Sequence, residues 1–215
     1  MCCESPKYAW NQIGVGRSKS PSGPFTDFKR SPVVTTGTMG DIDPTVFIDD
    51  DGQAYLYYGN NKCQYVKLNS YMINYDTSIG NKGIVTIPMT KETFGGVKQS
   101  DGTIDGDDCM EEGPWLDKRG DNYYLIYAAG GIPEHISYSM SKSPEGPWEY
   151  KGKIMYDQNT GSFTNHAGIV NYKGRDYFFY HTGWLKGGGG FNRSISVEEF
   201  KFNADGTIPE IKATR

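Results

Sequence analysis

The amino-acid sequence predicts an all-β fold built from repeated four-stranded sheets, the pattern of a β-propeller. Two observations predict it: three hairpin-like stretches that each begin with a polar residue, and an octapeptide that returns with six of its eight residues identical. In addition, no segment of the chain sustains the apolar periodicity of an amphipathic helix. Glycine supplies 28 of the 215 residues, nearly twice its ordinary usage, which is typical of a chain rich in turns.

The three hairpin-like stretches are versions of one another. They cover residues 43–58, 112–127 and 166–180. Each begins with Asp43, Glu112 or His166, continues as a short apolar strand, reverses at a glycine-containing turn and returns as an aromatic-rich strand. Because equivalent strands of a radial fold converge, we expect these three side chains to lie close together.

The repeated octapeptide completes the structural unit. Ser18–Phe25 returns as Ser141–Trp148, and an alternating strand-like run precedes both copies. One unit is therefore a hairpin, a third strand, a Ser-Lys-Ser-Pro-x-Gly-Pro corner and a fourth strand, as in a propeller blade.

The chain holds fewer units than a closed propeller needs. Only residues 1–11 precede the first octapeptide region, and they contain no glycine turn and no aromatic strand pair. Residues 13–34 supply half a blade, and the three hairpins supply three more. We therefore expect residues 1–215 to form one partial propeller domain of about three and a half blades, with the hairpin of the first blade missing upstream. A truncated chain, a cut reading frame and a second chain that completes the ring are the alternatives.

Charge and composition exclude several classes of function. A formal net charge of −4 argues against nucleic acid as a partner, and the longest apolar runs are strand-length, which argues against a membrane span. Neutral ligands fit better. The four cysteines, Cys2, Cys3, Cys63 and Cys109, have no metal-binding spacing, so we expect free thiols. The sequence leaves localisation open between secretion and the cytoplasm.

Carboxyl groups at the heads of neighbouring inner strands, surrounded by aromatic residues, suit glycoside hydrolysis. That reaction needs one acid that protonates the leaving oxygen and a second carboxylate, together with aromatic faces for the sugar. Either Asp43 or Glu112 taken alone could instead cap a turn. Their equivalent positions in different repeats favour chemistry.

At these residues the chain resembles glycoside hydrolase family 43. The resemblance rests on short motifs that occur in order along nearly the whole chain, namely Ile42-Asp43-Pro44, Glu112-Gly113-Pro114-Trp115, the two corners, Asn165-His166 and Gly190-Phe191-Asn192-Arg193. It implies a five-bladed β-propeller that cleaves α-L-arabinofuranosides, β-xylosides or arabinan in plant hemicellulose oligosaccharides and polysaccharides by single-step inversion.

The resemblance also implies roles for individual residues. Glu112 matches the general acid, and Asp43 matches the carboxylate that raises the acid's pKa and orients it. Adjacent strand residues face opposite ways, so Glu111 is excluded as the acid. His166 matches a histidine that often belongs to the shell of a central calcium ion, although calcium prefers oxygen ligands.

Three further residues are candidates for binding the substrate. Arg193 matches a substrate-contacting arginine, and a surface salt bridge is its alternative role. Trp115 and Phe191 belong to the motifs that carry the resemblance.

One catalytic group of the family has no match in this chain. The general base is an aspartate at the head of the first blade's inner strand, and Asp41 does not replace it because it has no hairpin of its own. We therefore expect the isolated chain to be inactive and to self-associate through the open blade gap. A non-catalytic carbohydrate-binding or scaffold fragment is the alternative function.

Overall fold

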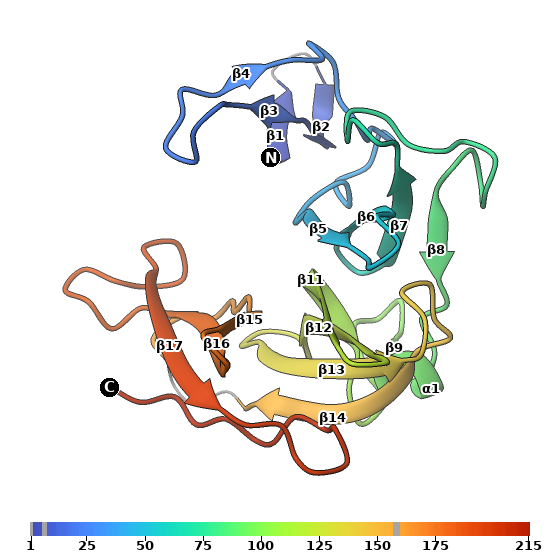
Figure 1. Ribbon diagram of the computed structural model, residues 1–215. Coiled ribbons are helices and arrows are strands. Elements are labelled where there is room, and N and C mark those ends of the chain that lie inside the picture. The colour runs from blue at the N-terminus through green and yellow to red at the C-terminus, as the bar shows by residue number, and fades with distance from the viewer. Residues whose placement is uncertain (1, 6–7, 157–159) are drawn as a thin grey trace. The chain divides into compact units, whose positions relative to one another are not determined.

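A computed structural model describes residues 2–5, 8–156 and 160–215, and it is almost entirely β-structure. The described residues form seventeen strands and one helix of four residues, arranged in antiparallel sheets (Figure 1). The chain divides into two compact units, Met1–Ile87 and Pro88–Arg215, and each is described by itself. Within the described part of the chain, no helix has the length and apolar character that crossing a membrane requires.

The first unit contains one complete four-stranded sheet. Its strands are β5 (Thr45–Ile48), β6 (Ala54–Tyr58), β7 (Cys63–Leu68) and β8 (Val85–Ile87), paired in that order. The predicted hairpin connects β5 to β6, and Gly52 adopts a φ of 84° in its turn. The strand β6 is buried along its whole length, so the aromatic-rich return strand lies at the centre of the sheet.

The start of the first unit corrects one expectation from the sequence. Residues upstream of the first corner do form a strand pair, because β1 (Cys2–Ser5) and β2 (Tyr8–Ile13) are antiparallel, with an irregular register at Glu4 and Ser5. A strand connection does not require glycine, and the sequence at this connection contains Ser5-Pro6, a pair that favours a turn. The corner itself joins β3 (Gly16–Arg17) to β4 (Thr26–Asp27).

The second unit contains the most complete blade. The strands β11 (Met110–Arg119), β12 (Asn122–Ala129), β13 (His135–Ser141) and β14 (Glu149–Met155) pair in sequence order (Figure 1). A tight turn at Gly120 connects β11 to β12, and the second octapeptide forms the corner between β13 and β14. The predicted unit of hairpin, third strand, corner and fourth strand is confirmed.

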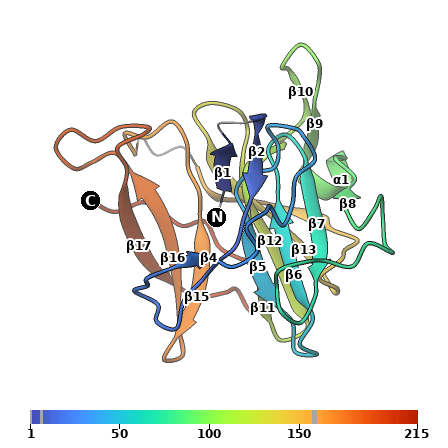
Figure 2. The same cartoon turned by 90° about the horizontal axis from the view of Figure 1, so that it is seen from above.

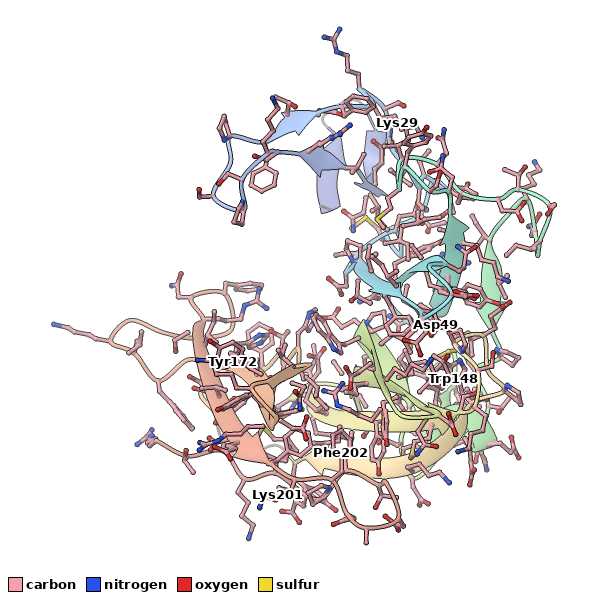
Figure 3. The ribbon with its side chains drawn as sticks, in the orientation of Figure 1. Lys29, Asp49, Trp148, Tyr172, Lys201 and Phe202 are labelled. Carbon is pink, nitrogen blue, oxygen red and sulfur yellow. The ribbon has the colours of Figure 1, made fainter. Side chains whose placement is uncertain are left out.

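A three-stranded sheet follows in the same unit. The third predicted hairpin is β15 (Gly168–Tyr172) and β16 (Arg175–Thr182), and β17 (Ser194–Phe200) pairs with β16 (Figure 2). The C-terminal tail returns to the preceding blade, where the Ile211 amide donates to the Ile154 carbonyl at 2.7 Å and Phe202, labelled in Figure 3, packs on Tyr124. Residues from both sheets and the tail form one hydrophobic cluster.

A small insertion precedes β11 and anchors it. It consists of α1 (Lys91–Phe94), β9 (Gly96–Lys98) and β10 (Ile104–Gly106), with Thr90 as the helix N-cap. Asp108 follows it, fully buried, and accepts hydrogen bonds from His135 at 2.9 Å, Ser137 at 2.5 Å and Tyr150 at 2.9 Å. These bonds tie the entrance of β11 to β13 and β14, so the strand that carries Glu112 begins from a fixed point.

Two of the four cysteines can be assessed. Cys63 and Cys109 are free and buried, as predicted. The side chains of Cys2 and Cys3 lie outside the described residues.

Candidate active site

Glu112 and His166, two of the three predicted strand-head residues, are in contact in the second unit. Glu112 is the third residue of β11, and His166 precedes β15. The Oε1 atom of Glu112 lies 2.8 Å from Nε2 of His166, and the two side chains are 19% and 31% exposed. The pair is therefore partly shielded from water but still accessible to a ligand.

Gly113 allows this close approach. Its φ is 62°, in the left-handed region that favours glycine, and a Cβ atom there would lie 2.9 Å from Cγ of the His166 ring. The Glu-Gly pair of the sequence motif thus has a physical reason. The glycine leaves room for the imidazole beside the strand that carries the acid.

The neighbouring Glu111 has different partners. It is buried, and its Oε2 atom lies 2.7 Å from Nζ of Lys98, while the thiol of Cys109 donates to Oε1 at 3.5 Å. The register between β11 and β12 is irregular on both sides of Glu112. Glu111 and Glu112 therefore have different environments, and of the two it is Glu112 that contacts His166.

The segment that leads into His166 is held by polar contacts from several elements. The carbonyl of Thr164 accepts a hydrogen bond from Nε2 of His181 at 2.6 Å, and its hydroxyl accepts one from Arg193 at 3.2 Å. The backbone amide of Asn165 donates to the carboxyl group of Glu134 at 2.7 Å. Arg193 therefore lies beside the segment that carries His166, where the resemblance implies a substrate contact.

Two ionisable groups near this segment have shifted pKa values. Burial, reinforced by the charge of Glu112, raises the pKa of Glu134 to about 7, against the opposing hydrogen bond from Asn165. Burial lowers the pKa of His181 to about 4, and the nearby positive charge of Arg193 adds to the effect. Near neutral pH, His181 is consequently uncharged and donates to Thr164.

Sequence reasoning did not find Glu134 and His181. Neither residue heads a repeated strand: Glu134 immediately precedes β13, and His181 lies near the end of β16. The dipeptide Glu134-His135, directly after a glycine-rich turn, was the available signal for the first. Nothing local to His181 distinguishes it from an ordinary strand residue.

The two predicted aromatic binding residues have different environments. Phe191 is 85% exposed and makes an edge contact with Phe163, with ring centroids 5.4 Å apart. Trp115 is only partly exposed and packs against the hydrophobic cluster of the second unit, and a Cβ atom at Gly168 would lie 3.5 Å from its ring. Phe191 offers a free aromatic face, whereas the environment of Trp115 favours a packing role.

Asp43 belongs to the first unit, at the entrance to β5. It adopts a φ of 56°, a conformation that aspartate tolerates better than most residues, and it is partly buried. Asp41 is fully buried and accepts hydrogen bonds from the amide and hydroxyl of Thr36 at 2.5 and 2.7 Å. Asp41 thus has a structural role in its own turn, consistent with its exclusion as a catalytic base.

Known proteins match this chain along most of its length. A β-xylosidase from Xylanibacter ruminicola is 29% identical over 93% of this chain and 66% of its own length. An arabinoxylan arabinofuranohydrolase from Bacillus subtilis (strain 168) is 32% identical over 94% of this chain and 42% of its own length. The chain therefore spans only part of the length of these relatives.

Solved structures agree with the sequence relatives. A family 43 arabinoxylan arabinofuranohydrolase from Bacillus subtilis, in complex with cellotetraose, matches 94% of this chain and 44% of its own with a TM-score of 0.73 and 29% identity. A family 43 β-xylosidase/α-arabinofuranosidase from a compost metagenome, in complex with xylotriose and described as a calcium-free form, matches 94% of this chain and 66% of its own, with a TM-score of 0.75 and 29% identity.

These matches confirm the predicted fold class, an all-β, incomplete five-bladed propeller. The sequence profile of glycosyl hydrolases family 43 also matches residues 2–208, nearly the entire chain. The chain therefore belongs to glycosyl hydrolases family 43.

Proposed function

We propose that the protein is a glycoside hydrolase that cleaves α-L-arabinofuranoside or β-xyloside linkages of plant hemicellulose with inversion. The contact between Glu112 and His166 carries the proposal, because it places a partly shielded carboxyl group and an imidazole together at the heads of strands in a family 43 chain. The names of the relatives, a β-xylosidase and arabinofuranohydrolases, support the substrate class.

In the proposed mechanism Glu112 is the general acid. Its carboxyl group gives a proton to the glycosidic oxygen as the bond to the sugar breaks, while water attacks the opposite face of the ring. Asp43 is the second carboxylate, which orients the acid and keeps it protonated by its negative charge. The proposal assigns no general base among residues 1–215.

Substrate contacts are proposed for Arg193 and Phe191. The guanidinium of Arg193, beside Thr164, can donate to sugar hydroxyls, and the exposed ring of Phe191 can stack on the apolar face of a sugar. Trp115 remains a predicted contact, although it packs on the core. Related structures in complex with xylose and with xylotriose support an oligosaccharide as the ligand.

A calcium ion is a separate part of the proposal, because one related structure is described as a calcium-free form. Calcium takes oxygen ligands, whereas His166 offers ring nitrogens, and its Nε2 contacts Glu112. Direct ligation of calcium by His166 would be unusual for this reason, so we propose His166 for the shell of the ion, and no step of the mechanism is assigned to the ion. Thermal unfolding with calcium and with a chelator tests whether the protein binds it.

The experiment that tests the function is hydrolysis of aryl α-L-arabinofuranoside and aryl β-xyloside by the full protein that contains these residues. Proton NMR of the fresh product should show the anomer opposite to that of the substrate. A product with retained configuration would contradict the inverting mechanism. Binding of xylo-oligosaccharides without any hydrolysis would contradict the enzyme and support a carbohydrate-binding protein.

A further inference from the structure

Glu134 is a buried carboxyl group that the mechanism above does not use. Only 6% of the residue is exposed, and it lies in the connection between β12 and β13. Its carboxyl oxygen Oε2 accepts a hydrogen bond from the Asn165 amide at 2.7 Å, and its own amide donates to the Phe163 carbonyl at 3.0 Å. Two contacts thus join residue 134 to the segment that leads into His166.

The contact with Asn165 satisfies a group that has little access to water. Asn165 is 3% exposed, so its backbone amide would be buried without this partner if the carboxyl group of Glu134 were removed. A buried, unpaired amide is costly, and the segment would then move to find another partner. The next residue along the chain is His166, whose ring contacts Glu112. A shift at Asn165 would therefore separate the imidazole from the acid.

We propose that Glu134 is a positioning residue for the candidate acid: its carboxyl group accepts the hydrogen bond from the backbone amide of Asn165 and so keeps His166 in contact with Glu112. The inference rests on the proposed function, because it deepens the account of the same site. Glu134 acts through Asn165 and His166 and does not touch the substrate.

The charge of Glu134 has a second effect at the same place. Burial raises the pKa of Glu134 to about 7, the charges of Glu112 and Glu111 on β11 also raise it, and His166, which precedes β15, lowers it. The charge of Glu134 therefore changes near neutral pH. Two carboxylates that repel each other resist ionising together. Removing the charge of Glu134 should let the acid lose its proton at lower pH.

Two substitutions separate the hydrogen bond from the charge. Glu134→Gln keeps an oxygen acceptor for Asn165 but removes the charge, whereas Glu134→Ala removes both. We expect Glu134→Gln to retain most of kcat. The basic limb of its pH–rate profile should move to lower pH, because the acid no longer has this negative charge nearby. We expect Glu134→Ala to lower kcat by about 10-fold or more with little change in KM, because the loss of the contact with His166 would leave the acid Glu112 poorly oriented. Glu210→Gln, at an exposed glutamate, is the matched control.

NMR of the protein provides a readout that does not need activity. In the wild type, the Asn165 amide proton should shift with pH as Glu134 ionises, and this shift should be absent in Glu134→Gln. In Glu134→Ala, the His166 ring resonances should move and the Asn165 amide should exchange faster with solvent. The chain has only three histidines, which makes the assignment direct.

The outcomes distinguish the two proposals. Predicted NMR changes in a protein that hydrolyses no glycoside would refute the proposed enzyme and support the positioning contact. The positioning role would be overturned if Glu134→Ala matched the wild type in its His166 resonances, in the exchange rate of the Asn165 backbone amide and in kcat. Circular dichroism detects whether Glu134→Ala unfolds globally. If it does, the test is the pH profile of Glu134→Gln together with the pH titration of its Asn165 backbone amide. If neither differs from the wild type, the inference is wrong.

Discussion

Gly113→Ala should damage both the stability of the second unit and the candidate site. The substitution places an L-residue at a φ of 62°, which costs about 1–2 kcal/mol in the left-handed region. The new Cβ would also lie 2.9–3.0 Å from three atoms of the His166 ring, closer than ordinary van der Waals contact. Overpacking of this kind costs about 1–3 kcal/mol, so we expect a total loss of about 2–5 kcal/mol in the free energy of unfolding.

Gly120→Ala is the matched control for the backbone term. Gly120 has a φ of 55°, and a Cβ atom there meets nothing within 4 Å, so this variant should lose only about 1–2 kcal/mol. Thermal unfolding measures both losses, at about 2–4 °C of Tm per kcal/mol for a chain of this size. Only Gly113→Ala should also lower kcat, because His166 must move away from Glu112. Equal losses of stability and unchanged kcat in both variants would refute this account of the glycine.

Three other predictions concern the catalytic carboxylate, the buried anchor and the isolated chain. Asp43→Asn should move the basic limb of the pH–rate profile to lower pH, whereas a profile that only scales down would give Asp43 a purely structural role. Burial alone would raise the pKa of Asp108, but hydrogen bonds from His135 and two hydroxyl groups outweigh burial and lower the pKa. Asp108→Asn should therefore destabilise the protein by about 3–5 kcal/mol at neutral pH. Because a lowered pKa stabilises the fold above the unfolded value and this stability is lost as pH falls, the difference between wild type and variant in urea unfolding should shrink below about pH 4. Residues 1–215 should self-associate and should hydrolyse aryl glycosides about 10²- to 10⁴-fold more slowly than a version extended upstream by an aspartate-headed hairpin, and a monodisperse short chain of equal activity would be the opposite result.

The sequence predicted the repeated parts of the structure well. The three hairpins and the two corners form where the repeats indicated, because glycine turns and alternating apolar residues determine such elements locally. The contact between Glu112 and His166 was predictable for the same reason, since both residues occupy equivalent positions in successive repeats.

The remaining features depend on contacts between residues far apart in the chain. The connection between β1 and β2 lacks the glycine of the other hairpins, and Glu134 meets Asn165 only after two connecting segments fold against each other. The irregular register around Glu112 and Trp115 breaks the strict alternation of strand faces, so the packing of Trp115 could not be derived from its position in the strand. Such irregularities arise from tertiary packing rather than from residue spacing.

The most direct test of the central claim is the leaving-group dependence of Glu112→Gln in the full protein. An amide cannot donate the proton that a poor leaving group needs, so hydrolysis of xylo- or arabino-oligosaccharides should fall by about 10²- to 10⁴-fold. Aryl glycosides with strongly acidic phenols as leaving groups need little protonation, and their hydrolysis should fall far less. Equal losses on both kinds of substrate would contradict the assignment of Glu112 as the general acid.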